Sequence, residues 1–229
     1  MPRTLAPPAP TTDQALTARA LIFDLDGVLV QSNPISERHW RRWARERDVS
    51  YEHIAAVHHG RPTVETIREV APHLDAEAEA ERKEGREAED TDGLTAFDGA
   101  HRLTAALPDG RWTIATSGRR RTATTRLAHV GLPRPETLVT ADDVASGKPA
   151  PDPYRLAAER LGLRPQDCIV IEDAPAGVES ARRAGAQVVA VTSSNDADAL
   201  AAADAVVPRL ADVHATLDDA ERVRVRWEA

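Results

Sequence analysis

The sequence predicts an α/β protein with a doubly wound, Rossmann-like parallel sheet and a small inserted helical cap domain. Short apolar runs alternate along the chain with amphipathic helical patterns. Several of these runs stop abruptly at polar residues. One long segment near the beginning interrupts the alternation because it has helical patterns and no strand pattern.

The apolar run at 20–23 ends at Asp24 and is typical of a strand that is buried on both faces of a parallel sheet. Three further runs repeat this form and a fourth, at 205–207, is weaker. The three stronger runs lie at 112–115, 168–171 and 187–191.

Helical patterns separate the strands, at 119–129, 153–161, 176–184 and 196–203. A glycine follows three of these helices, which is where a left-handed residue ends a helix. These glycines are Gly131, Gly162 and Gly185. Strand and helix in alternation predict parallel strands joined by right-handed crossovers.

The segment 32–97 is too long for a single crossover and has no strand pattern. We therefore expect a helical cap at 32–97 between two parts of an α/β core, 20–31 and 98–229, with a disordered lead-in at 1–19. Trp40 and Trp43 are expected in the core of the cap. The charge run at 75–92 is expected to be a solvated helix face.

The composition of the chain limits the classes of function and partner that it can have. The chain has 229 residues, 41% hydrophobic and 29% charged, which is ordinary for a globular protein. The net charge of -8 argues against nucleic acid or an anionic membrane as a partner. No segment approaches the roughly 18 apolar residues of a membrane span. The single cysteine, Cys168, excludes an internal disulfide and is expected to be buried and inert. We expect a cytoplasmic protein, as a monomer or homodimer.

Two of the 29 basic residues are lysines, Lys83 and Lys148, and the others are arginines. A lysine kept in so arginine-rich a chain indicates a need for a compact ammonium group. Lys83 lies in the charge run and is expected to be incidental. Lys148 lies in a turn between Gly147 and Pro149 and is a candidate for function.

Polar residues follow the predicted strands at the edge where ligands of open α/β sheets bind. Asp24 and Asp26 follow the first strand, Thr116 and Ser117 the second, and Glu172 and Asp173 the third. Each motif alone has an ordinary explanation as a turn or a helix cap. Their joint arrival at one edge favours a shared site.

Two carboxylates this close repel each other unless a cation or a proton is shared between them. With Asp173 they form an oxygen-rich pocket that suits Mg²⁺. The Thr116 hydroxyl and the N–H groups after it can bind phosphoryl oxygens, and Lys148 supplies a positive charge. These groups predict a magnesium-dependent phosphatase that attacks a small phosphate ester with Asp24.

Four segments resemble the four motifs of the haloacid dehalogenase superfamily: 21–30 (LIFDLDGVLV), 116–118 (TSG), 147–152 (GKPAPD) and 171–177 (IEDAPAG). The resemblance implies Asp24 as nucleophile and Asp26 as general acid and then base. It also implies Mg²⁺ held by the Asp24 carboxylate, the Asp26 carbonyl and Asp173, with Glu172 nearby. Thr116, Ser117 and Lys148 would bind the phosphoryl group.

Asp26 bears on the type of reaction. A proton donor is useful when an alkoxide leaves, so a phosphate ester is favoured over a haloacid. The segment 58–63 (HHGRPT) resembles the cap loop of the phosphatases of glycerol phosphate, deoxyglucose phosphate and other sugar phosphates. That likeness implies that Arg61 reaches the substrate, and His59 either contacts it or holds the loop.

Two alternatives remain open at this stage. Sugar phosphomutases of the β-phosphoglucomutase type share the four motifs, but they usually carry a histidine where this chain has Ser36. A non-catalytic regulator that only binds a phosphometabolite would need neither Asp24 nor Asp26.

The segment 222–227 alternates between apolar and charged residues as a strand does, and we expect it either at a sheet edge or in a dimer contact.

Overall fold

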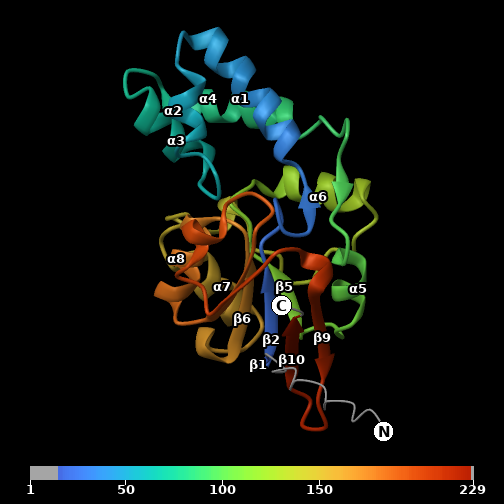
Figure 1. Cartoon of the computed structure of the whole chain (residues 1–229). Helices are drawn as coiled ribbons and strands as arrows, with labels where there is room; N and C mark the ends of the chain where they lie inside the picture. Colours follow the sequence, from blue (N-terminus) through green and yellow to red (C-terminus); the bar gives the residue numbers. More distant parts are fainter. Residues whose placement is uncertain (1–14, 228–229) are drawn as a thin grey trace, which may run out of the picture.

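A five-stranded parallel sheet with the order β5-β2-β6-β7-β8 forms the centre of the protein in a computed structural model that describes residues 15–227 (Figure 1). The five strands are β2 (Ala20–Phe23), β5 (Trp112–Ile114), β6 (Cys168–Glu172), β7 (Gln187–Val191) and β8 (Ala205–Val207). All five lie where the apolar runs predict them. The sheet is parallel throughout, which confirms the predicted α/β class.

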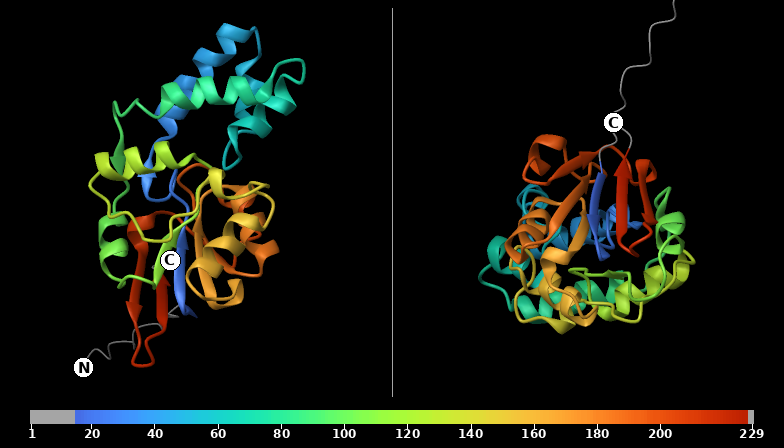
Figure 2. Two further views of the ribbon diagram at one scale, coloured as in Figure 1. Left: turned by 180° about the vertical axis from the view of Figure 1, so that it is seen from behind. Right: turned by 90° about the horizontal axis from the view of Figure 1, so that it is seen from below.

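Alternate residues of each strand enter different cores, so both faces of the sheet are covered. Leu21 and Phe23 of β2 pack in one cluster with α5 (Ala100–Ala105) and α6 (Arg120–His129). Ile22 packs in the other with α7 (Asp152–Arg160) and α8 (Pro175–Ala184). The two views in Figure 2 show these helices around the sheet.

The strand order reverses at β2, because β5, the next strand of this sheet along the chain, lies on one side of β2 and β6 lies on the other. The crevice at such a switch point is the usual ligand site of a doubly wound sheet. Phe23 pairs with Ile114 and Ile171, so the polar residues after these strands emerge next to one another.

A second sheet, antiparallel with the order β1-β10-β9, packs against the same cluster as α5 and α6. It consists of β1 (Ala15–Ala18), β9 (Val213–Leu217) and β10 (Val223–Trp227). The prediction of a disordered lead-in at 1–19 was therefore wrong at 15–18, which form β1. Residues 1–14 of that lead-in lie outside the part of the chain that the structure describes. The alternation at 222–227 does form a strand, but β10 is the middle strand of its sheet and not an edge.

The segment predicted as a helical insertion, 32–97, lies over the carboxyl ends of the parallel strands (Figure 1). Its four helices are α1 (Asn33–Arg47), α2 (Tyr51–Ala55), α3 (Thr63–Val70) and α4 (Ala76–Glu87). Trp40 and Trp43 are buried in a separate cluster and meet edge to face, 5.7 Å between ring centroids, as expected of core residues.

Two expectations for the insertion were wrong. It contains a short strand, β4 (Thr95–Ala96), which pairs with β3 (Val30–Gln31), and the two segments that join insertion and core run together there. The charge run is not a uniformly solvated face, since Glu79, Lys83 and Glu87 are buried. Lys83 ion-pairs with Glu87, and its ammonium lies 4.3 Å from the centre of the Trp40 ring.

The expected helix at 196–203 is also absent, and only one short 3-10 helix stands there. The described chain has such helices at η1 (Ala141–Asp143), η2 (Pro165–Asp167), η3 (Ala197–Leu200) and η4 (Leu210–Asp212). Asp196 and Asp198 favour caps and turns over helix interiors, which accounts for the shorter element.

No helix among the described residues is long and apolar enough to span a membrane.

Candidate active site

Four loops bring their polar residues together where β2, β5 and β6 end. Asp24, Thr116 and Asp173 are 5%, 2% and 3% exposed, and Lys148 is fully buried. This is the juxtaposition expected from the sequence. Below, the "floor" of the site means Asp24, Lys148, Tyr154, Glu172 and Asp173.

Lys148 is the cation at the centre of the floor. Its ammonium donates to Oδ1 of Asp24 at 2.6 Å and to Oε1 of Glu172 at 2.8 Å. Burial alone would lower the pKa of Lys148, but the two carboxylates raise it above its ordinary value. Lys148 is therefore charged, and it fixes one oxygen of Asp24 while the other remains available.

Glu172 holds Lys148 in place. Its Oε1 accepts from Lys148 and from the Tyr154 hydroxyl at 2.7 Å, and its Oε2 accepts from the N–H groups of Asp173 and Ala174 at 2.8 and 3.0 Å. These four bonds occupy the acceptor positions of one carboxylate. A Cβ at Gly177 would lie 1.6 Å from Oε1 of Glu172, so only glycine leaves room for this arrangement.

Asp173 is oriented by residues that the sequence analysis did not identify. The Ser194 side chain hydrogen-bonds its carboxylate, and Nδ2 of Asn195 donates to its carbonyl at 2.9 Å. Nδ2 of Asn33, at the beginning of the insertion, donates to Ser194 at 2.6 Å. Gly27 has φ +87°, and a Cβ there would lie 1.9 Å from Oδ2 of Asp173.

The floor gathers more carboxyl groups than Lys148 could balance if all of them were ionised. Oxygens of Asp24, Glu172 and Asp173 lie within 4.8 Å of one another. Burial, with repulsion from Glu172 and Asp26 and against the opposing effect of Lys148, raises the pKa of Asp24 to about 7. Burial and the neighbouring carboxylates also raise the pKa of Asp173. A buried oxygen-rich cluster of this kind is suited to a divalent cation.

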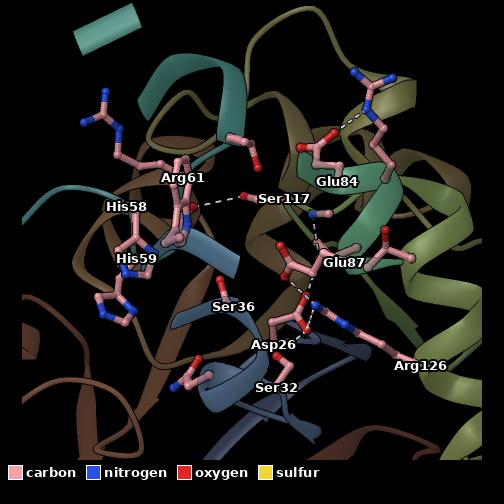
Figure 3. Close-up of a pocket in the computed structure, with 18 of the residues that line it drawn as sticks. Asp26, Ser32, Ser36, His58, His59, Arg61, Glu84, Glu87, Ser117 and Arg126 are labelled. Carbon is pink, nitrogen blue, oxygen red and sulfur yellow. Dashed lines mark hydrogen bonds and ion pairs between the residues drawn. The ribbon is translucent and has the colours of Figure 1, made fainter. Parts of the chain in front are cut away.

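Asp26 lies beside the floor and its carboxylate lines the pocket. Its Oδ1 accepts from the Ser32 hydroxyl at 2.6 Å and from Arg126. Its Oδ2 has one long contact, 3.4 Å from the Thr116 hydroxyl. Figure 3 shows Asp26, Ser32 and Arg126 together, with Glu87 on the other side of the guanidinium.

The loop after β5 is arranged to present a hydroxyl and backbone N–H groups. The N–H of Gly118 donates to the Thr116 hydroxyl oxygen at 3.0 Å. The Ser117 hydroxyl instead donates to the carbonyl of Gly60 at 2.9 Å, and so it connects the core to the loop of the insertion. In this structure Ser117 positions that loop, while Thr116 faces Asp26.

The insertion supplies the opposite wall, with His58, His59 and Arg61 (Figure 3). The two imidazoles stack with centroids 4.0 Å apart. Burial, with a smaller effect of His59, lowers the pKa of His58 to about 3, so that ring is neutral at ordinary pH. Arg61 pairs with Glu69 through Nη1 at 2.7 Å, while its buried Nε has no hydrogen-bond partner.

Sequence reasoning missed the residues that support the site. Tyr154, Ser32 and Ser194 carry hydroxyl groups that no motif distinguishes from ordinary surface residues. Arg126 and Glu87 lie in helical patterns whose charged positions look alike, so nothing local shows which of them turn inward.

Comparison with known proteins gives a consistent result. The model of the haloacid dehalogenase-like hydrolase family matches residues 18–185. The chain is 41% identical over 218 residues to hexitol phosphatase A of Escherichia coli (strain K12), with 92% of this chain and 95% of that protein covered. It is 33% identical to glycerol-1-phosphate phosphohydrolase 2 of Saccharomyces cerevisiae, covering 83% and 81%. A crystal structure of a hydrolase from Pseudomonas syringae aligns with TM-score 0.76 at 28% identity, covering 84% and 94%.

Proposed function

Because the chain belongs to the haloacid dehalogenase-like hydrolase family, we propose that it is a magnesium-dependent phosphatase of a small sugar- or polyol-phosphate monoester. The observation that carries this proposal is the pairing of two carboxylates. Asp24 is buried and held by Lys148, and Asp26, two residues on, faces the pocket. Hexitol phosphatase A and glycerol-1-phosphate phosphohydrolase 2, the two relatives described above, support the same substrate class.

The residues have distinct roles in the proposed reaction. The free oxygen of Asp24 attacks phosphorus, the bond to the ester oxygen breaks, and that oxygen takes a proton from Asp26 as the alcohol leaves. Asp26 then accepts a proton from the water that attacks the aspartyl phosphate. Thr116, the N–H groups after it and Lys148 hold the phosphoryl oxygens, and Ser117 secures the loop beside them.

The floor fits a magnesium ion because it gathers three buried carboxylates around a single ammonium group. Asp24 and Asp173 would hold the ion, with the carbonyl of Asp26. The ion would neutralise charge on the phosphate and on the attacking carboxylate. Glu172, whose acceptors are occupied by hydrogen bonds, would orient Lys148 and the Asp173 loop.

The opposite wall suits a hydroxylated substrate. His58 is a neutral donor and acceptor, Arg61 has a free Nε–H, and Ser36 adds a hydroxyl to the lining. We assign the hydroxyls of the sugar or polyol to this wall, with Arg61 as the main contact and His59 supporting the loop. The mutase alternative has less support, since hexitol phosphatase A and glycerol-1-phosphate phosphohydrolase 2 are both named as phosphatases. A cytoplasmic location remains a prediction.

A panel of phosphate esters tests the proposal. Purified protein with Mg²⁺ should release phosphate from a hexitol, glycerol or hexose phosphate. Asp24→Asn should abolish release while circular dichroism stays that of the folded protein. Isomerisation of β-glucose 1-phosphate with a bisphosphate primer, in the absence of release, would establish the mutase. Inactivity toward every ester, with binding retained, would favour the regulator.

Magnesium dependence is tested separately. Chelation of divalent ions should stop phosphate release, and Mg²⁺ should restore it. Asp173→Asn should raise the Mg²⁺ concentration needed for half-maximal rate by about tenfold or more, the scale on which changes around a metal site act. Full activity after chelation would exclude the metal from the reaction.

A further inference from the structure

Arg126 connects the acid–base group of the core to the far end of α4 in the helical insertion. It lies on α6 and is 5% exposed. One end of its guanidinium, Nη1, donates to Oδ1 of Asp26, and the other, Nη2, donates to Oε1 of Glu87 at 2.7 Å. Figure 3 shows the guanidinium between the two carboxylates.

On the core side, Arg126 selects which oxygen of Asp26 faces the pocket. Ser32 and Arg126 both donate to Oδ1. Oδ2 is left with only the long contact to Thr116, and so it is the oxygen available to exchange a proton with a leaving group. Rotation of the carboxylate would break two hydrogen bonds at once, one of them to a charged donor.

On the insertion side, Glu87 is the last residue of α4 and is 7% exposed. Although burial alone would raise it, Lys83 and Arg126 lower the pKa of Glu87 to about 2, so the carboxylate is ionised at ordinary pH. A buried guanidinium that loses one of two anionic partners is strongly disfavoured. Arg126 therefore keeps its place only while α4 lies against α6.

Two other ion pairs connect the same two regions of the chain, at or just beyond the ends of α4 and α6, without touching Asp26. Arg119 pairs with Glu84, and Arg121 pairs with Glu89 just beyond α4. The side chains of Arg121 and Glu89 are 68% and 71% exposed. Exposed pairs of this kind contribute little. These pairs provide an internal control for contact between the two regions. They join the same regions as Arg126, but they are more exposed and do not contact Asp26.

We propose that Arg126 is a positioning residue that orients Asp26 for proton transfer, and that it does so only while Glu87 of the insertion holds its other end. Seating the insertion on the core and aligning the proton donor are then a single event. The inference rests on the proposed phosphatase function, in which Asp26 protonates the leaving alcohol.

The test compares two leaving groups. The alkoxide of glycerol phosphate needs a proton to leave, whereas p-nitrophenolate leaves without one. In Arg126→Gln, kcat for glycerol phosphate should fall about 100-fold, the scale of a misplaced reacting group, and kcat for p-nitrophenyl phosphate should fall less than about threefold. KM for both should change little. Glu87→Gln should shift the ratio of the two rates in the same direction by about tenfold. Asp26→Asn provides the reference for complete loss of the proton donor.

Controls separate positioning from folding. Arg121→Gln should leave both rates unchanged. Arg126→Lys keeps a charge and should recover part of the glycerol phosphate rate, and guanidinium ion, below unfolding concentrations, should do the same for Arg126→Ala. Thermal unfolding identifies any variant that does not fold, and in that case Arg126→Lys and Glu87→Gln carry the test.

The opposing outcomes are distinct. Equal losses for both esters in Arg126→Gln, without rescue, would show a structural role only and overturn the proposal. An altered ratio in Arg126→Gln with none in Glu87→Gln would refute the coupling to the insertion. A normal ratio in Asp26→Asn, or no hydrolysis of either ester by the unaltered protein, would instead overturn the proposed function and this inference with it.

Discussion

The floor of the site and the helical insertion each contain one of the two lysines of the chain, and these lysines occupy opposite kinds of environment. Lys148 lies at the ends of the parallel strands among three buried carboxyl groups, more than one ammonium group can balance. Lys83 lies between Glu87 and the Trp40 ring, in a balanced network that Arg126 completes. The floor thus gathers three carboxyl groups around one ammonium group, whereas each buried charge of the network in the insertion has a partner of opposite charge.

The largest expected effect separates the two lysines. Lys148→Met leaves Asp24 and Glu172 without their cation, and loss of one partner from a buried ion pair costs about 3–5 kcal/mol. We expect that reduction in the free energy of unfolding in urea, measured without metal, and partial recovery with Mg²⁺. Lys83→Met is the matched control, with a clearly smaller loss because Glu87 keeps Arg126. Equal losses would contradict the contrast between the regions.

Glu87→Gln tests the balanced network through pH. The folded protein holds the pKa of Glu87 at about 2, below its ordinary 4.5, so the ionised carboxylate adds stability above pH 4.5 that is lost as pH falls through 2. The shift corresponds to about 3 kcal/mol. The urea midpoints of the unaltered protein and of Glu87→Gln should differ most at pH 7 and converge toward pH 3. A constant difference would mean that the glutamate acts through packing and not charge.

Tyr154→Phe probes how tightly the floor is held. It removes the hydroxyl that donates to Glu172 at 2.7 Å and leaves the ring in place. A buried acceptor that loses its donor costs about 1–3 kcal/mol. Urea unfolding should show that loss, together with a lower kcat, because Glu172 orients Lys148. Unchanged stability would indicate that water replaces the hydroxyl.

Arg42→Gln has the smallest expected effect. Arg42 pairs with Glu46 on the exposed side of α1, and Glu46 keeps a second partner in Arg86. Removal of one exposed pair should change the free energy of unfolding by less than about 0.5 kcal/mol. Phosphate release should not change. A larger effect would show that the surface pairs of the insertion act as a network.

Asp24, Glu172 and Asp173 of the floor could be predicted from sequence because they directly follow apolar runs, as Thr116 beside the floor does, whereas Tyr154 was missed. A parallel sheet brings such residues to one edge whatever lies between them, so Asp24, Thr116 and Asp173 required only the strand pattern. Lys148 required its own rarity as well, and the strand order required the structure.

The buried charges of the insertion resisted prediction because alternating charges look the same on a solvated helix and on a buried one. Lys83 and Glu87 were therefore assigned to solvent. A signal was present, since Ala76, Ala80, Lys83 and Glu87 fall on one face of α4 at spacings of three and four, and the two alanines mark that face as packed. The partner of that face, Arg126, depends on how two distant helices meet, which no local pattern records.

The central place of β10 in the small sheet has a consequence for biosynthesis. Its partner β1 precedes the whole of the parallel sheet in the chain, and β10 follows it. During translation, β1 therefore lacks its hydrogen-bonding partner until residues 223–227 have left the exit tunnel of the ribosome. Long-range pairings of this kind form slowly and expose strand edges to aggregation in the meantime.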